Sequence, residues 1–564
     1  MPSALRRFFA PSFRLKKTSD KQVHRKAADM RKLRRVRIGP MQPRAGMASR
    51  QPEAGDSPRS LGILRPEASG TESDPAMKRL SQKEAGAYYT PDHVADSLLH
   101  WAIRSEQDRL LDPSCGDGRF IAGHRNSVGI EQDDLAAQLA VARAPGALVH
   151  QGDFFSWAAN TIDRFECAAG NPPFIRYQTF TGEVRARANE LCERVGACFS
   201  GLASSWAPFL VATATLLRPG GRMAFVVPAE IGHAPYSAPL LEYLTSNFGV
   251  VQIVAVRDKL FPDLSEDCWL LYADGYGRQT SEIRFTAQDS FTRAWSPPQH
   301  FARIPVDQWR TTWKNRLRPF ILGSGVRELY RCTVEEEGTR RFGDLASIGI
   351  GYVTGANDFF HLRPSVARTL KIPNDLLKPT VRKGSVLPRS RLTHSTVSKW
   401  LEDDEQMLLL RLPKVGRVPA SVGRYLDSAA GHAARETYKC RVREPWFSVP
   451  DVHVPDFFLS YMSGLEPSLV RNEADCTCTN SVHGVRLKAG AKAAGLLKAW
   501  DSDFVRLSCE LEGHPLGGGM LKLEPREATS IAIPASSAVD RLNGPAISDA
   551  LSTLRQWRHY APAQ

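Results

Sequence analysis

The chain has 564 residues, of which 42% are hydrophobic, so it is long enough for two to four domains with buried cores. No apolar run approaches the roughly 18 residues that a membrane span needs, and ten cysteines in a chain of this length do not make a disulfide scaffold. The net charge of +14 lies almost entirely in residues 1–50, which hold 15 Lys and Arg against 2 Asp and Glu. The remaining residues total +1, so net charge alone does not indicate nucleic-acid binding by the folded part. We expect a cytoplasmic protein with no membrane segment.

Residues 1–76 are predicted to be a disordered basic tail, because arginine clusters alternate there with Pro, Gly and Ser and aromatic residues are few. Three interpretations remain open. The tail is a basic arm that binds DNA, an Arg-rich targeting presequence, or an over-extended start that function does not need. The third is favoured, with Met47 or Met77 as the working start, because recognisable structure begins only at Met77.

Residues 77–290 are predicted to form one α/β domain. Apolar residues at helical spacing predict helices over residues 93–104 and 204–217, and the Pro-Gly-Gly within 218–221 is expected to stop the second helix. Short apolar runs between turn residues predict strands over residues 109–112, 127–131, 147–153, 165–171, 222–228, 250–256 and 268–274. This alternation predicts a doubly wound sheet with ligand sites at the carboxyl ends of its strands.

Residues 300–564 have a different texture, with frequent turn residues and short strand signals. They are predicted to form a separate mixed α/β module, with a boundary near residues 280–305. The closest cysteine pair, Cys476 and Cys478, is a weak zinc signal without a partner pair, and no metal is expected.

The strongest chemical signal is the tetrapeptide Asn171-Pro172-Pro173-Phe174, which directly follows a predicted strand. Two prolines stiffen the backbone and remove two N–H donors, which leaves carbonyl oxygens available to a cleft. The Asn171 side chain adds another acceptor. Together they could accept both hydrogens of an exocyclic amino group and hold its nitrogen lone pair out of conjugation, while Phe174 offers a flat face to the ring. Alone, the tetrapeptide also fits a Pro-rich turn with a core Phe.

The segments before this tetrapeptide favour a nucleotide-like ligand. The sequence Asp112-Pro-Ser-Cys-Gly-Asp-Gly-Arg-Phe follows the first predicted strand and opens a helix, and its glycines allow close approach of a ligand to the backbone. Glu131 ends the second strand, 19 residues after Asp112, a spacing that suits a ribose diol. Asp153 and Phe154 follow the third, where they could bind an adenine amino group and pack on its ring. Each acid alone would more often be a solvated strand end.

Taken in order, these motifs resemble the S-adenosylmethionine-dependent amino-methyltransferases of DNA. Cofactor segments that precede the NPPF tetrapeptide, with a specificity region after it, are similar to the gamma class of N6-adenine methyltransferases of restriction–modification type, typified by the TaqI enzyme. The resemblance covers residues 85–275 well and extends weakly to about residue 540. It implies a Rossmann-like class I methyltransferase domain over residues 77–290 and a target-recognition domain over residues 300–564.

The resemblance also assigns roles to single residues. Thr90 would bind the methionine carboxylate of S-adenosyl-L-methionine, and Glu131 would bind its ribose. The methionine-side loop would comprise Asp112, Ser114 and Gly116, and the adenine clamp would comprise Asp153 and Phe154.

For the substrate, Asn171 and the Pro172 carbonyl would hold the target amino group of a flipped adenine, with Phe174 stacked on the base. Phe261 would supply a second aromatic contact with that base, although an ordinary core position suits it too. Relatives often have Tyr where this chain has Phe174, which keeps the stacking face and lacks a hydroxyl.

The expected partner is double-stranded DNA, contacted by a monomer, and a separate cognate restriction endonuclease is left open. The segment from Gly349 to Asn357 is similar to the start of a target-recognition region in this family. Cations that could contact phosphates or a guanine edge are Arg382, Lys383, Arg389, Arg391, Lys439, Arg441 and Arg443. The polar residues Asn480 and His483 are weaker candidates for the DNA face.

Three other functions stay open. The chain could methylate an RNA guanine or a protein glutamine, although enzymes with similar motifs usually lack so large a C-terminal module. It could be a non-catalytic nucleic-acid-binding protein, against which the intact NPPF and acids argue. It could be a fused restriction–modification enzyme, but the region before residue 77 is too short and too polar for a nuclease core.

Overall fold

The computed structural model describes residues 89–560, apart from residues 177, 202 and 263. These residues all lie within one compact unit of the chain, residues 61–564. The basic tail predicted over residues 1–76 therefore lies outside the described residues. None of the helices in the described part combines the length and the apolar composition that crossing a bilayer requires.

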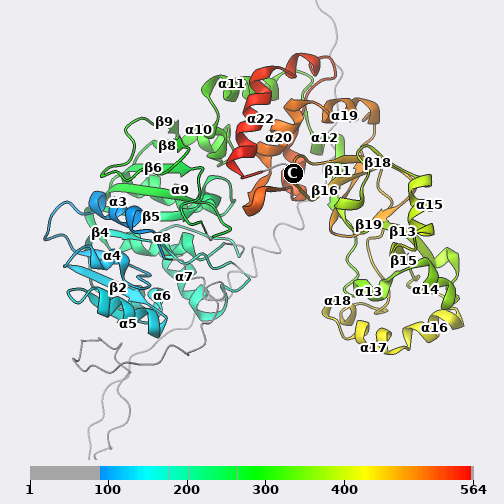
Figure 1. The fold of residues 1–564 in the computed structure, drawn as a ribbon, viewed down its shortest axis with the longest axis horizontal. Helices are drawn as coiled ribbons and strands as arrows, with labels where there is room; N and C mark the ends of the chain where they lie inside the picture. The colour runs from blue at the N-terminus through cyan, green and yellow to red at the C-terminus, as the bar shows by residue number, and fades with distance from the viewer. Residues whose placement is uncertain (1–88, 177, 202, 263, 561–564) are drawn as a thin grey trace, which may run out of the picture. The chain divides into compact units, whose positions relative to one another are not determined.

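The first half of the described chain forms a nine-stranded sheet of order β3-β2-β1-β4-β5-β7-β6-β8-β9 (Figure 1). Its strands are β1 (Leu110–Asp112), β2 (Ser127–Glu131), β3 (Leu148–Gln151), β4 (Phe165–Gly170), β5 (Leu217–Pro228), β6 (Phe248–Val256), β7 (Cys268–Tyr276), β8 (Glu282–Gln288) and β9 (Ala302–Pro305). Strands β3, β2, β1, β4 and β5 run parallel, and β7 is antiparallel to both β5 and β6. The predicted Rossmann-like class I methyltransferase sheet is confirmed.

Helices cover both faces of this sheet: α3 (Asp92–Ala102), α4 (Arg119–Ala122), α5 (Asp134–Arg143), α6 (Phe154–Asn160), α7 (Gly182–Arg194), α8 (Trp206–Thr215) and α9 (Ser237–Asn247). Successive residues of a strand point to opposite faces, and the two hydrophobic clusters follow that alternation. Ala168 and Phe225 pack with α6, α8 and α9, whereas Cys167 and Ala224 pack with α3. Because β4 and β5 are buried on both faces, their sequences contain nearly continuous apolar runs, the pattern from which these strands were predicted.

One predicted boundary is wrong. The residues expected to follow the helix as a stop signal, 218–221, lie inside β5 rather than before it. Leu217 already pairs with Phe165 of β4, and pairing resumes at Arg222 with Cys167, so the intervening Pro-Gly-Gly forms an irregularity in the strand. The helix itself does end before this point, at Thr215.

After β9 the chain forms a helical layer and four small sheets. The helices are α10 (Val306–Thr311), α11 (Ser324–Glu335), α12 (Phe342–Leu345), α13 (Asn357–Phe360), α14 (Pro364–Thr369), α15 (His394–Glu402), α16 (Ala420–Leu426), α17 (Ala429–Arg435), α18 (Tyr438–Arg441), α19 (Ala493–Trp500), α20 (Asp503–Glu512), α21 (Pro525–Ser530) and α22 (Pro545–Trp557). The small sheets have the orders β11-β20-β16-β18-β14, β12-β15-β13-β19, β17-β22-β21 and β10-β23.

The strands of these sheets are short, as predicted. They are β10 (Arg340–Arg341), β11 (Ala346–Ile350), β12 (His361–Leu362), β13 (Leu377–Val381), β14 (Arg391–Thr393), β15 (Leu408–Leu410), β16 (Phe457–Ser460), β17 (Met462–Ser463), β18 (Leu469–Glu473), β19 (Thr477–Cys478), β20 (Val482–Leu487), β21 (His514–Leu516), β22 (Met520–Lys522) and β23 (Ala532–Ile533).

Helices α20 and α22, two of the last three α-helices in the described chain, belong to the core of the large sheet. Phe504, Leu507 and Leu554 lie in the same hydrophobic cluster as residues of β4, β5 and β6. A buried ion network reinforces this packing, because Glu510 contacts Arg318 at 3.1 Å and Arg558 at 2.8 Å. The end of the chain therefore stabilises the half that contains the predicted catalytic residues.

Candidate active site

The predicted cofactor and substrate residues meet at the carboxyl ends of β1, β2, β3 and β4. A cavity of about 480 Å³ lies there. Eight of the eleven predicted site residues line it: Ser114, Gly116, Glu131, Asp153, Phe154, Asn171, Pro172 and Phe174. These residues come from four separate strand ends, and the parallel order of the sheet brings them together.

The loop after β1 is shaped by its glycines and fixed to Glu131. Gly116 adopts a φ of +53° and Gly118 a φ of +87°, a region that favours glycine. The Gly116 N–H donates to Oε2 of Glu131 at 2.9 Å, and the Asp133 N–H donates to Oε1 at 2.8 Å. Both carboxylate oxygens are thereby oriented by backbone groups at the edge of the cavity. A ribose diol fits such a carboxylate, because each oxygen can accept a second hydrogen bond.

Asp112 and Thr90 lie behind the cavity wall rather than on it. Oδ1 of Asp112 accepts from the Ser114 N–H at 3.1 Å, and Oδ2 accepts no hydrogen bond from any described residue. The pKa of Asp112 is raised to about 8, mainly by burial; the Ser114 N–H opposes this shift and the nearby Glu131 carboxylate contributes to it. Thr90 is also buried, and its carbonyl accepts from Arg119 at 3.0 Å.

Asp153 and Phe154 begin α6. Oδ2 of Asp153 accepts from both the N–H and the hydroxyl of Ser156 at 2.7 Å, which caps the helix. Phe154 is only 3% exposed and stacks on Phe209 with ring centroids 4.9 Å apart. Ser156 and Phe209 therefore fix the two residues of the predicted adenine clamp in place. Asp153 and Phe154 both line the cavity.

Two serines clamp the NPPF loop and leave one carbonyl open. The Ser114 hydroxyl donates to the Asn171 carbonyl at 3.2 Å, and the buried Ser205 hydroxyl donates to the Pro173 carbonyl at 2.5 Å. Among the described residues, none donates a hydrogen bond to the Pro172 carbonyl. Pro172 therefore presents a carbonyl acceptor that no described residue uses, between the occupied carbonyls of Asn171 and Pro173. The sequence predicts that an amino group binds at this position.

Ser205 holds the loop at more than one atom. Besides its bond to Pro173, its hydroxyl accepts from the Ile175 N–H at 3.1 Å, and its own N–H donates to the Ile175 carbonyl at 3.0 Å. The sequence analysis did not identify Ser205. Its position directly before α8 is a typical helix-start signal, which could have drawn attention to it.

The aromatic residues are arranged differently from expectation. Phe174 lines the cavity and packs against both core clusters. Phe261 is only 6% exposed and packs with Leu260 and Leu264 in one of these clusters, so it does not line the cavity. Tyr89, to which the sequence assigned no role, lines the cavity and lies against Gly116.

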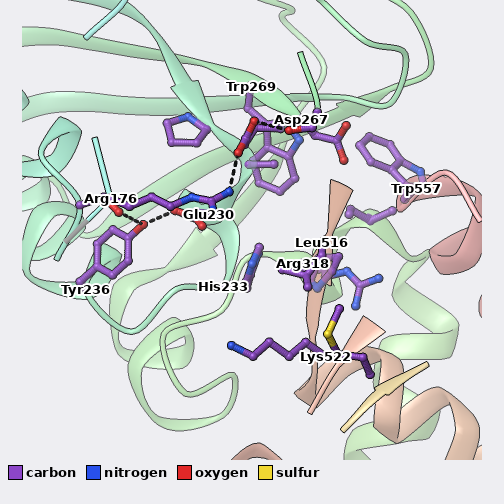
Figure 2. A pocket seen from close by; sticks show the side chains of 18 of the residues that line it. Arg176, Glu230, His233, Tyr236, Asp267, Trp269, Arg318, Leu516, Lys522 and Trp557 are labelled. Atoms are coloured by element: carbon purple, nitrogen blue, oxygen red, sulfur yellow. Dashed lines mark hydrogen bonds and ion pairs between the residues drawn. The ribbon is translucent and has the colours of Figure 1, made fainter. Parts of the chain in front are cut away.

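A second cavity has a volume of about 520 Å³ (Figure 2). Arg176, which lies two residues after the NPPF tetrapeptide, is among the residues that line it. On one wall Arg176 pairs with Glu266 at 2.8 Å, and the Tyr236 hydroxyl donates to Glu230 and is also hydrogen-bonded to the Ser204 hydroxyl. Leu516 and Lys522 of the β21–β22 hairpin lie on the opposite wall. These contacts hold two segments next to the NPPF loop. Arg176 lies just after the loop in the chain, and Ser204 directly precedes Ser205, which is bonded to the loop.

Several residues proposed to contact DNA are instead used inside the protein. Arg443 donates to the carbonyls of Val353 and Thr354, and Arg382 donates to Gln406. His483 is fully buried, with its ring bonded to the Leu523 carbonyl at 2.7 Å, so its predicted place on the DNA face is wrong. Other proposed cations are exposed: Lys383, Arg389, Arg391, Lys439 and Arg441.

The described residues contain no cluster of three or more His, Cys, Asp or Glu side chains placed to bind a metal ion. Cys476 and Cys478 are free and buried, and burial raises the pKa of each thiol to about 12. Both therefore behave as neutral core residues at physiological pH.

Comparison with known proteins identifies both halves of the chain. Residues 129–261 match the Eco57I restriction-modification methylase family, and residues 314–559 match the C-terminal domain of Type II methyltransferase M.Eco57I. The chain is 23% identical to Type II methyltransferase M.XamI of Xanthomonas campestris pv. amaranthicola over 80% of this chain and 85% of the relative. It is 19% identical to Type II methyltransferase M.AccI of Acinetobacter calcoaceticus over 79% and 84%.

Among solved structures, the Type IIL restriction-modification enzyme MmeI in complex with DNA is 12% identical, with a TM-score of 0.48 over 83% of this chain and 71% of that chain. The type IIG restriction endonuclease BpuSI is 16% identical, with a TM-score of 0.39 over 83% of this chain and 64% of that chain. The two family matches follow one another along the chain and cover most of its described part. The two halves of the chain are similar to restriction–modification methylases of the Eco57I type, and the chain is an S-adenosylmethionine-dependent DNA methyltransferase.

Proposed function

We propose that this enzyme methylates the N6 amino group of an adenine that has been flipped out of double-stranded DNA at a specific site. The observation that carries the proposal is the Pro172 carbonyl, which stands without a partner among the described residues between two carbonyls held by Ser114 and Ser205. S-adenosylmethionine, when bound, would supply an electrophilic methyl group. The chain needs no strong base, because the amino proton can leave after the nitrogen has been alkylated.

The residues around the cavity fit this cofactor. Glu131, oriented by two backbone N–H groups, suits the ribose, and Asp153 with Phe154 suits the adenine ring. Gly116, with Tyr89 against it, leaves room for the methionine end, while Ser114 ties that loop to the catalytic one. Asp112 and Thr90 would act from behind this wall, and the buried Oδ2 of Asp112 has acceptor capacity that no described residue uses.

The chain's own contribution to the reaction is to position the amino group. The Pro172 carbonyl and the Asn171 side chain would accept its two hydrogens, so the nitrogen lone pair turns out of the ring plane and toward the cofactor side of the cavity. Phe174 would stack on the flipped base and repay part of the few kcal/mol that flipping costs. Because both reactants are held, the rate gain comes from orientation. Phe261 would support this stacking from the core behind Phe174.

Finer expectations complete the proposal. The enzyme acts as a monomer in the cytoplasm, and residues 300–564 recognise the target. A separate nuclease of the same specificity would make its methylation protective. Light scattering of the purified chain with and without duplex DNA tests the monomer.

The central test is long-read kinetic sequencing of DNA from a methylation-free bacterial host that expresses the chain. We expect N6-methyladenine in one sequence motif, and its absence with the Asn171→Ala variant. Methylated cytosine in place of adenine would overturn the proposed target. If no base is modified although the purified chain binds S-adenosylmethionine, an RNA guanine or a protein glutamine becomes the substrate to test, and a chain that does not bind the cofactor would be a non-catalytic binding protein.

A further inference from the structure

A strongly basic segment lies in the second half of the chain. Residues 411–443, which include helices α16, α17 and α18, contain 8 Lys and Arg against 2 Asp and Glu. The segment therefore carries +6, whereas the remainder of the chain beyond residue 50 carries −5, because all residues beyond 50 total +1. The near-neutral balance of the folded chain conceals this local charge. We call residues 411–443 the basic helical surface.

Most of these cations are exposed and lack acidic partners. Seven of the eight side chains are exposed: Arg411, Lys414, Arg417, Arg424, Arg435, Lys439 and Arg441. Within the described chain, none of the seven forms an ion pair, although exposed arginines elsewhere do. Arg310 on α10, for example, is exposed and pairs with both Glu242 and Asp307. Positive charges that form no ion pairs repel one another, so an anionic partner would stabilise this surface.

The surface is fixed to the start of the proposed target-recognition region. Tyr425 of α16 stacks on Phe359 with ring centroids 4.6 Å apart and an interplanar angle of 5°, and its hydroxyl donates to the Phe359 carbonyl at 2.8 Å. Gly355 has a φ of +86°, and a Cβ placed there would lie 2.6 Å from Cβ of Lys439, so glycine allows α18 to approach. The cations are thus displayed from a braced support, and Arg443 adds two bonds to the same segment.

We infer that the basic helical surface contacts the phosphate backbone of the duplex and supplies affinity that is independent of sequence. Five of the seven exposed cations are arginines, whose guanidinium groups suit bidentate contact with phosphate. Tyr438, which is 67% exposed beside Lys439, adds a hydroxyl that can reach the same backbone. This inference rests on the proposed DNA substrate and assigns base reading to other parts of the C-terminal half.

The test compares two triple variants with the full-length enzyme. The first is Arg424→Gln, Arg435→Gln and Arg441→Gln, with one change on each of α16, α17 and α18. The control removes the same charge from exposed cations elsewhere that form no ion pair with a described residue: Arg125→Gln, Lys492→Gln and Arg526→Gln. Fluorescence anisotropy measures the Kd for a duplex with and without the methylated motif, at several salt concentrations. Kinetic sequencing then reads the motif that each variant methylates.

Each released phosphate contact lowers the slope of log affinity against log salt by about 0.9, so three contacts would lower it by about 2 to 3. We expect this fall in the first variant on both duplexes, an affinity loss of about tenfold or more near physiological salt, and an unchanged methylated motif. The control variant should keep the wild-type slope. An equal slope in all three proteins would overturn the inference, and would direct attention to an acidic protein partner. A changed motif would overturn it too, because the cations would then read bases.

The two proposals fail separately. If the wild type leaves DNA unmethylated but the first variant alone loses salt-dependent affinity, the surface stands and the proposed reaction fails. If the wild type methylates adenine and both variants bind alike, the reaction stands and the surface fails.

Discussion

The clamp by Ser205 can be tested through the substitution Ser205→Ala. The hydroxyl donates to Pro173 and accepts from Ile175, and the side chain is fully buried. Its removal leaves the Pro173 carbonyl and the Ile175 N–H without this partner, in a segment that is only partly buried. A fully buried polar group left without a partner costs about 1–3 kcal/mol. If displacement of the Pro172 carbonyl from its productive position raises the activation barrier by about 2 kcal/mol, kcat falls about 30-fold, since each 1.36 kcal/mol is a factor of ten.

The assay is single-turnover methylation of a duplex carrying the motif, with saturating S-adenosylmethionine. We expect kcat to fall while the Kd for the cofactor stays within about twofold, because Glu131 and Asp153 are held by other groups. Thr213→Val is the matched control, because Thr213 lies on α8, which Ser205 directly precedes. Thr213 is fully buried and uses its hydroxyl only within the helix, on the Phe209 carbonyl. Equal kcat in the two variants would refute the positioning role, and so would a parallel loss of cofactor binding in Ser205→Ala alone.

Four further predictions follow from the same contacts. Asn171→Ala should bind S-adenosylmethionine normally by calorimetry and lose methyl transfer; transfer near the wild-type rate would contradict the assigned mechanism. Burial raises the pKa of Asp112 to about 8, above an unfolded value of about 3.9, so its protonation favours the folded state and the free energy of unfolding should fall as pH rises from about 4 to 8. The free energy of unfolding of Asp112→Asn, measured by denaturation at several pH values, should lack that part of the decline. Parallel pH profiles for the wild type and the variant would contradict this prediction. Glu510→Gln should lower the free energy of unfolding by about 3–5 kcal/mol, because it leaves two buried arginines without their shared carboxylate; a loss under 1 kcal/mol would show that water or relaxation replaces it. Deletion of residues 1–76 should leave methylation largely intact, and a large loss of DNA affinity would revive the basic-arm interpretation.

Local sequence predicted the parts of the fold that depend on neighbours two to four residues apart. The strand over residues 127–131 has the predicted bounds, and the NPPF tetrapeptide follows β4 as expected. Apolar periodicity and turn residues act over such short distances, so they are visible in a single sequence. The alternation of strands and helices predicted the sheet, whose parallel strands place their carboxyl ends at one edge. The cofactor class was predicted from the family resemblance that the order of the motifs carries.

The tertiary structure decided every feature that depends on contacts between distant residues. It placed β7 between β5 and β6, added β8 and β9, and brought α20 and α22 into the core of the large sheet. It also set Tyr89 rather than Thr90 on the cavity wall and kept Phe261 behind it. The clamp of Ser205 on Pro173 joins residues 32 positions apart. Such contacts follow from chain topology and side-chain packing, which no periodicity in the sequence records.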